Sequence, residues 1–118
     1  MHARLTRYYL KVGAADDAVA LMADRWLPLI RESPGFRSFQ VIGIQRDSGY
    51  APDGDQLVTL LEHDTREQSL DALEMAQEWI FKHVSHLLIR PSEMLMGDVL
   101  LSGEPEGTSA RPPDPDAS

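Results

Sequence analysis

Cysteine is absent from the 118-residue sequence, and several kinds of site are excluded with it. Disulfides, thiolate catalysis, cysteine-based zinc sites and iron–sulfur clusters all require its thiol group. Positive charge is also scarce, because 11 lysines and arginines stand against 19 aspartates and glutamates, a net charge of −8. Such a balance disfavours contact with nucleic-acid phosphates. The sequence therefore predicts an acidic protein that does not bind nucleic acid.

Long apolar runs are missing too. No segment approaches the ~18 consecutive apolar residues that a membrane span needs, and no apolar signal region follows the first residues of the chain. We therefore expect a cytoplasmic protein that does not bind membranes.

The motifs of several common enzyme classes do not occur. The sequence contains no G-x-G-x-x-G, no P-loop and no G-x-S-x-G, so nicotinamide, nucleotide and serine-hydrolase chemistry have no support. His83 and His86 have a spacing that could supply two nitrogens to a metal, but no third ligand is identifiable. We predict neither a cofactor nor a metal.

The length and the 42% hydrophobic content are typical of one globular domain. Residues 103–118 differ from the rest, because they hold four of the eight prolines and nothing more apolar than alanine. Such a segment cannot bury enough apolar surface to offset its ordering entropy. We expect a folded domain over residues 1–102 and a disordered, acidic tail over residues 103–118.

The patterning of residues 1–102 predicts four strands and two helices. Strands are expected over residues 3–12, 36–45, 56–63 and 94–101. The first helix begins after Asp16 or Asp17 and runs to about residue 32, with Pro28 expected to kink or tighten its last turn. The second begins at a capping box, either Asp64 with Glu67 or Thr65 with Gln68, and runs to about residue 88.

The element order, βαββαβ, predicts an α+β fold of the ferredoxin-like kind: a four-stranded antiparallel sheet with both helices on one face. In the second strand, Phe36 is expected to share a face with Ile42 and Ile44, and Phe39 with Val41. In the second helix a stripe is expected to face the core: Leu70, Leu73, Gln77, Ile80, Val84 and Leu87.

The other sheet face would carry apolar side chains without a cover. The candidates for bulky positions there are Arg7, Tyr9, Phe39, Val41, Val58 and Leu60. An apolar sheet face of this kind needs a partner. A twofold homodimer that stacks sheet on sheet is the simplest solution.

Short segments along the chain occur in the order typical of one family. They are Pro28, residues 33–39 (SPGFRSF), residues 54–55 (GD) before the third strand, residues 64–67 (DTRE), residues 76–79 (AQEW) and Gly97. On these segments the sequence resembles the antibiotic-biosynthesis monooxygenase-like branch of the dimeric α/β-barrel superfamily, over about residues 2–101. The resemblance implies a dimer whose sheets face each other, with a cavity beside each sheet.

Within that family, the branches that oxygenate polyketide-type aromatics or degrade haem rely on asparagine and tryptophan in the cavity, and the haem branch adds a histidine on the second helix. This sequence has no asparagine, and His63 stands where those branches often place tryptophan. Neither set of site residues is present intact.

Two histidines are candidate catalytic bases. His63 closes the third strand just before a helix begins, and an unperturbed histidine titrates near pH ~6.5, which suits proton abstraction. His83 follows Trp79 by one helical turn, and His86 continues the same face. Trp79 is a candidate wall for a flat aromatic ligand. The alternative is that His63 is a partly exposed residue of a capping turn and that Trp79 only packs the helix edge.

Four further residues are candidates for ligand binding. Arg7 and Tyr9 share a face of the first strand and could orient an anionic or phenolic ligand, or contact the partner subunit. Gln40 is polar among apolar neighbours, so it needs a partner in a ligand or nearby. Tyr50 lies in the long loop 46–55, a candidate lid. We expect the pocket between the open sheet face and the edge of the second helix.

Two functions fit these residues. The first is a cofactor-independent monooxygenase-like protein that acts on or binds a small aromatic, quinol-type ligand. The second is a non-catalytic homodimeric ligand-binding or accessory domain. A closed interior filled by the protein's own side chains would favour the second; Phe39, Val41, Leu60 and Met96 are the side chains concerned.

Overall fold

The protein is described by a computed structural model over residues 1–44, 54–103 and 105. Its sheet has the strand order β2-β3-β1-β4 with every neighbouring pair antiparallel. The strands are β1 His2–Leu10, β2 Phe36–Gly43, β3 Asp55–His63 and β4 Glu93–Asp98. The predicted ferredoxin-like α+β fold is confirmed, although the last strand ends at Asp98 and not at residue 101. Tyr50 and the predicted tail, apart from residues 103 and 105, lie outside the described residues.

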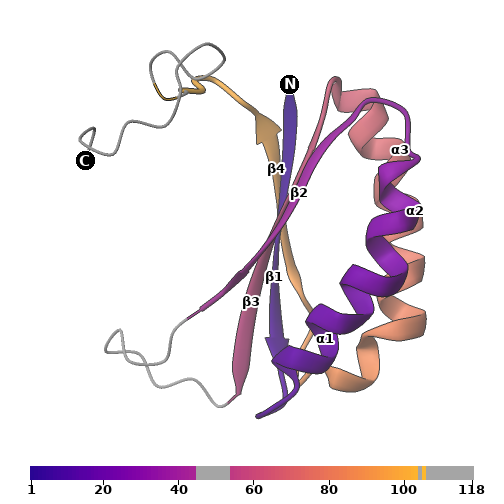
Figure 1. Ribbon diagram of the computed structural model, residues 1–118, viewed down its shortest axis with the longest axis vertical. Helices are drawn as coiled ribbons and strands as arrows, with labels where there is room; N and C mark the ends of the chain where they lie inside the picture. The colour runs from indigo at the N-terminus through magenta and orange to yellow at the C-terminus, as the bar shows by residue number, and fades with distance from the viewer. Residues whose placement is uncertain (45–53, 104, 106–118) are drawn as a thin grey trace, which may run out of the picture.

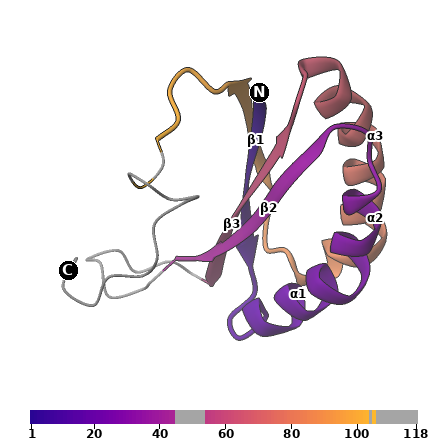
Figure 2. The ribbon, with the colours of Figure 1, turned by 45° about the horizontal axis from the view of Figure 1, so that its top comes forward.

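The helices form one layer on one face of the sheet, and no described helix or strand covers the other face (Figures 1 and 2). The first helical segment comprises α1 Ala15–Leu21, a π-helical turn Met22–Trp26 and α2 Leu27–Arg31. The second is α3 Arg66–His83, followed by a short 3-10 turn Ser85–Leu87. Among the described residues, no helix combines the length and the apolar character that a membrane crossing requires.

The irregularity expected at Pro28 occurs as a wider turn just before it. The Leu27 amide donates to the Met22 carbonyl, five residues back, and Pro28 itself has no N–H to continue the usual ladder. Turns of this π type occur often at functional sites. Here the turn ends at Trp26, which is buried.

The capping box of α3 uses Thr65 and Gln68, the second of the two predicted registers. The Gln68 amide donates to Thr65 Oγ1 at 3.2 Å, and the Thr65 amide donates to Gln68 Oε1 at 3.1 Å. The helix ends at His83 and not near residue 88.

The predicted apolar stripe of α3 was wrong at Leu70 and Gln77, which are exposed, but right at Ile80, Val84 and Leu87, which pack in or against the core. The buried residues are Ser69, Ala72, Ala76 and Trp79, whereas Leu70 is 42% exposed. Small side chains let the helix lie close to the sheet, and the single large one, Trp79, fills the remaining space. The spacing of leucines does not predict the buried face of a helix when the close approach of that helix to the sheet requires small side chains at the contact.

A bulge in β2 overturns the predicted face of Phe36. Phe39 and Val41 share a face as predicted, but it is the helix-covered face and not the open face on which they were expected. Phe36 pairs with His63 and Ser38 with Glu62, so one extra residue, Arg37, lies between two consecutive pairs. An extra residue reverses the side on which the preceding side chains lie. Phe36 therefore packs toward the helices together with Phe39 and Val41. By the same register, Gln40 and Ile42 are exposed on the uncovered face.

Gly54 is expected to tolerate no side chain, because a Cβ atom there would lie 1.9 Å from the Leu10 carbonyl oxygen. Gly54→Ala must displace the backbone where β1 ends, so we expect a loss of about 1–3 kcal/mol of unfolding free energy in urea titrations. Gly43→Ala is the matched control, since a Cβ atom at that position would have no neighbour within 4 Å. Equal stability of the two variants would contradict this close approach.

Candidate functional site

The sheet side that faces the helices is polar along its centre. Alternate residues of β1 point to this side, and each pairs directly with a residue of β3 on the same side. The pairs are His2 with His63, Arg4 with Leu61, Thr6 with Thr59 and Tyr8 with Leu57. All eight side chains are buried. Six polar residues beneath two helices are not what a plain hydrophobic core requires, so this layer is the candidate site.

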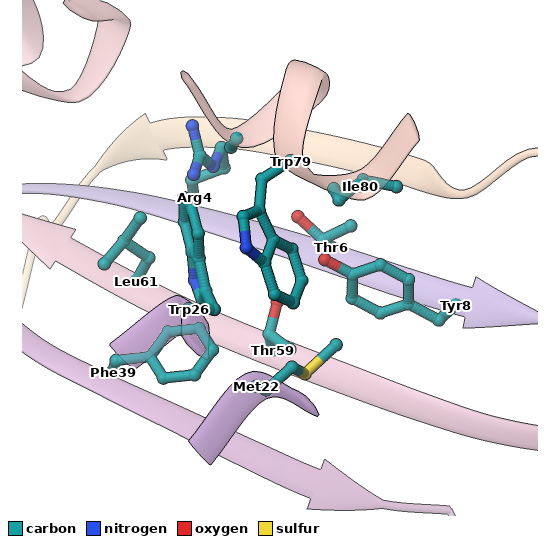
Figure 3. A pocket seen from close by; sticks show the side chains of 11 residues that line it. Arg4, Thr6, Tyr8, Met22, Trp26, Phe39, Thr59, Leu61, Trp79 and Ile80 are labelled. Atoms are coloured by element: carbon teal, nitrogen blue, oxygen red, sulfur yellow. The ribbon is translucent and has the colours of Figure 1, made fainter. Parts of the chain in front are cut away.

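A narrow cavity lies in this layer (Figure 3). Its lining comes from β1, β2, β3 and both helical segments: Arg4, Thr6, Tyr8, Met22, Trp26, Phe39, Thr59, Leu61, Ala76, Trp79 and Ile80. The two indoles lie with ring centroids 5.3 Å apart. The free volume is about 10 Å³, room for about one water molecule. A larger ligand therefore has to displace the side chains that fill the interior.

Arg4 brings a positive charge into the cavity. It is 3% exposed, and its Nη1 atom has no hydrogen-bond partner. Burial lowers the pKa of the Arg4 guanidinium, partly offset by Tyr8, but an arginine in a protein stays protonated.

Tyr8 supplies a neutral phenol near that charge. Burial raises the pKa of Tyr8 to about 12, although a hydrogen bond with Thr59 and the charge of Arg4 act in the opposite direction. The phenol therefore keeps its proton at neutral pH. Its hydroxyl can therefore donate a hydrogen bond in the cavity that Tyr8 lines.

His63 lies in the pair next to that of Arg4 and Leu61 and is fully buried. The Ser33 hydroxyl donates its only proton to the Ile30 carbonyl at 2.6 Å, so at 2.9 Å it accepts from His63 Nε2. Neutral His63 consequently carries its hydrogen on Nε2. The lone pair is on Nδ1, which is buried and has no partner.

The electrostatics of the layer keep His63 neutral. Burial lowers the pKa of His63, and the charges of Arg4 and His2 lower it further, against a smaller opposite effect of Asp64. Near pH 7 the imidazole is therefore an unprotonated base. The layer holds four buried polar atoms without partners among the described residues: His2 Nδ1, Arg4 Nη1, His63 Nδ1 and Ser69 Oγ.

Acidification should remove stability through His63. Because its folded-state pKa lies below the unfolded value of about 6.5, the unfolded chain binds the proton first as the pH falls. The free energy of unfolding should therefore decrease from about pH 6.5 downward until the folded-state pKa is passed. Thermal melts across this range should show a weaker decrease for His63→Gln than for the wild type. His86→Gln, on an exposed turn, should match the wild type.

The predicted site residues lie on both sides of the sheet. Trp79 lines the cavity, and its ring lies 5.1 Å from that of His83, which is half-buried and does not line the cavity. His86 falls beyond the end of α3, so it does not continue the face of Trp79 and His83 as predicted. The helices cover the side of the sheet that holds the cavity, not the open face where the pocket was expected.

Arg7, Tyr9 and Gln40 belong to the open face instead. Arg7 Nε donates to Gln56 Oε1 at 3.0 Å. The Tyr9 hydroxyl donates to Glu93, and the Arg90 guanidinium lies 3.8 Å from the centre of the Tyr9 ring. These residues therefore do not surround one cavity with Trp79 in a single chain, and their role in binding stays a prediction.

Sequence reasoning overlooked Arg4, Tyr8 and Trp26 as site residues. A signal was available for the first two, because His2, Arg4, Thr6 and Tyr8 alternate along β1, a polar row at the spacing of one strand face. Trp26 also had a signal, because Met22, Trp26 and Ile30 recur at a spacing of four residues, and all three are buried. Within the described ranges, no cluster of three or more His, Asp or Glu side chains could hold a metal ion.

The sequence matches no protein-family model and no curated protein. Solved structures do match. A provisionally assigned antibiotic biosynthesis monooxygenase from Nitrosomonas europaea is 16% identical, with a TM-score of 0.67 over 86% of this chain and 100% of that one. The chain therefore has the fold of the antibiotic biosynthesis monooxygenase-like proteins, as the sequence resemblance predicted.

Two further structures contain ligands. A monooxygenase from the gene ActVA-Orf6 of Streptomyces coelicolor, in complex with nanaomycin D, is 17% identical, with a TM-score of 0.66 over 89% of this chain and 92% of that one. A variant of MhuD with two manganese protoporphyrin IX molecules per active site is also 17% identical, with a TM-score of 0.66 over 89% and 100%. At these identities the likeness concerns the fold.

Proposed function

We propose that this protein binds a small aromatic, quinol-type ligand between the sheet and the helices and oxygenates it without a cofactor. The observation that carries the proposal is the cavity itself, with aromatic walls from Trp26, Trp79 and Phe39. One same-side pair further along the sheet lies the buried, neutral His63, which does not line the cavity and whose Nδ1 has no partner. The bound nanaomycin D and manganese protoporphyrin IX in two proteins of the same fold support a ligand-binding role.

The chemistry requires a base and exclusion of water. His63 Nδ1 takes the proton of a ring hydroxyl, which leaves an electron-rich anion. That anion reduces O2 directly; one oxygen atom enters the ring, and the other leaves as water with two hydrogens from the substrate. A quinol and O2 thus give a hydroxyquinone and water. Tyr8, which keeps its proton, donates a hydrogen bond to a ligand oxygen.

The test is oxygen uptake with naphthohydroquinone. Uncatalysed oxidation of a quinol produces hydrogen peroxide, whereas the proposed reaction produces water, so catalase should release no oxygen from the enzymatic reaction. We expect protein-dependent uptake that catalase does not reverse, with the hydroxylated quinone as product. Uptake at the protein-free rate would contradict the oxygenase proposal.

The narrowness of the cavity favours the second candidate function, a non-catalytic ligand-binding or accessory domain. Of the four side chains expected to fill a closed interior, Phe39 lines the cavity, together with Met22 and both tryptophans. Binding of the quinol without oxygen uptake would select this alternative.

We also propose that the protein is a homodimer that pairs through the open sheet face. The register gives two rows across this face: Gln40, Leu60, Leu5 and Leu95, and next to it Ile42, Val58, Arg7 and Glu93. Leu95 is 68% exposed and Ile42 48%. An apolar centre with a polar rim is typical of a protein interface.

A further inference from the structure

Arg4 is a buried cation whose counter-ion is not found in the described part of the chain. The side chain is 3% exposed and its Nη1 atom has no partner. Among the described residues no carboxylate forms an ion pair with it. On the same side of the sheet, Asp98 stands opposite His2, one pair away, and is exposed. A buried charge without a partner loses hydration free energy that nothing offsets, so the burial of Arg4 indicates that another group pairs with it.

In the proposed dimer, the partner subunit would not supply the missing carboxylate. Arg4 lines the cavity on the helix-covered side of the sheet (Figure 3), whereas the open face, where a second subunit is proposed to pack, is the opposite side. The neighbouring titratable groups, His2, His63 and Tyr8, carry no negative charge at neutral pH to offset the guanidinium, since burial raises the pKa of Tyr8 to about 12. The layer is therefore positive where the cavity is.

We infer that the quinol-type ligand of this cavity carries a carboxylate group and that Arg4 binds this carboxylate. This inference rests on the proposed function, since it specifies the ligand of the same cavity. A guanidinium binds a carboxylate through two parallel hydrogen bonds. One permanent cation matches a monoanion, whereas a phosphate dianion would require more positive charge than the cavity lining holds. The indoles of Trp26 and Trp79 pack against the ring system.

The experiment compares naphthalene carboxylate with the corresponding neutral carboxamide, which has the same ring and nearly the same shape. The chain has two tryptophans, and both line the cavity, so intrinsic fluorescence reports on the site itself. Because hydrogen bonds to a charged group contribute more than neutral ones, the carboxylate should bind the wild type at least about tenfold more tightly.

Variants at Arg4 separate recognition from structure. Arg4→Met has a similar length and no charge; it should abolish the preference for the carboxylate while the melting temperature stays within a few degrees of the wild type or rises, because a buried unpaired charge is removed. Arg4→Lys keeps the charge and should retain part of the preference. Arg31→Met, at the exposed end of α2, is the matched control and should change neither quantity.

The outcomes are distinct. If both probes bind the wild type with equal affinity, the inferred role of Arg4 is wrong while the proposed function stands. If neither probe nor naphthohydroquinone perturbs the fluorescence, the proposed function fails and the inference fails with it. If Arg4→Met lowers the melting temperature strongly and Arg4→Lys does not keep the preference, Arg4 has a structural role and the inference is overturned.

Discussion

Replacing His63 with glutamine is expected to reduce oxygen uptake with naphthohydroquinone by a factor of about 100 or more, because general-base catalysis contributes factors of this size. His63 is fully buried, its Nε2 donates to Ser33, and its free lone pair is on Nδ1. Glutamine has a side-chain N–H that can donate to Ser33 but no basic nitrogen. The fold should therefore persist while the base is lost.

Binding should respond much less than turnover. Fluorescence titration of His63→Gln under anaerobic conditions should give a dissociation constant within a few-fold of the wild type, since the aromatic walls and Arg4 are untouched. His83→Gln makes the same change at the second candidate base, and its oxygen uptake is compared with that of His63→Gln. Neither histidine lines the cavity, but His63 is fully buried in the polar layer that contains it, whereas His83 is only half-buried on α3. This variant should therefore retain most of the oxygen uptake.

Two results would reject the role of His63. Full activity of His63→Gln would mean that another group takes the proton, and loss of activity in His83→Gln alone would assign the base to α3. The pH dependence gives an independent check. Burial and the charges of Arg4 and His2 lower the pKa of His63, so the acid limb of the rate profile should lie below about pH 6.5.

The order of elements was predictable from the sequence because it depends on local signals. Glycine and proline mark the turn before β2, capping residues mark the start of α3, and apolar alternation marks the strands. The direction of side chains was less predictable. The bulge at Arg37 turns Phe36 toward the helices, and no local signal in the sequence distinguishes it from a regular strand.

The candidate site could be predicted only in part for the same reason. Trp79 and His63 were identified by their residue types and their places near element ends. Arg4 was not, because an arginine near the beginning of a strand ordinarily points to solvent. Its burial follows from tertiary structure: α3 presents Ser69, Ala72 and Ala76 to the sheet, and these small side chains bring the helix close over a polar row.

Val58→Asp is expected to convert the proposed dimer into monomers. Val58 lies on the open sheet face, between Arg7 of β1 and Ile42 of β2. Next to this row, Leu60, Leu5 and Leu95 form the apolar centre that a second sheet would cover. Sheet-on-sheet packing would bury this centre, and specific interfaces of this kind exceed ~1,200 Å².

A carboxylate placed in that interface lies opposite Arg7, whose guanidinium offsets part of its charge. Its desolvation and the loss of the apolar valine contact should still cost about 1.5 kcal/mol per carboxylate, and the twofold axis places two of them in the interface. The dissociation constant should increase by a factor of about 100 or more. Light scattering at micromolar concentration should then give the mass of one 13.2 kDa chain for Val58→Asp and twice that mass for the wild type.

Val19→Asp is the matched control, because it makes the same valine-to-aspartate change outside the proposed interface. Val19 is 38% exposed on α1, which lies in the helix layer and away from the open face. It should keep the mass of the wild type. Because a monomer that keeps its fold should retain the far-UV circular dichroism of the wild type, the spectrum separates dissociation from unfolding. A wild-type mass of a single chain would reject the dimer. A Val58→Asp protein that keeps the mass of two chains would show that the subunits pair through another surface, and the open sheet face would then need a different partner.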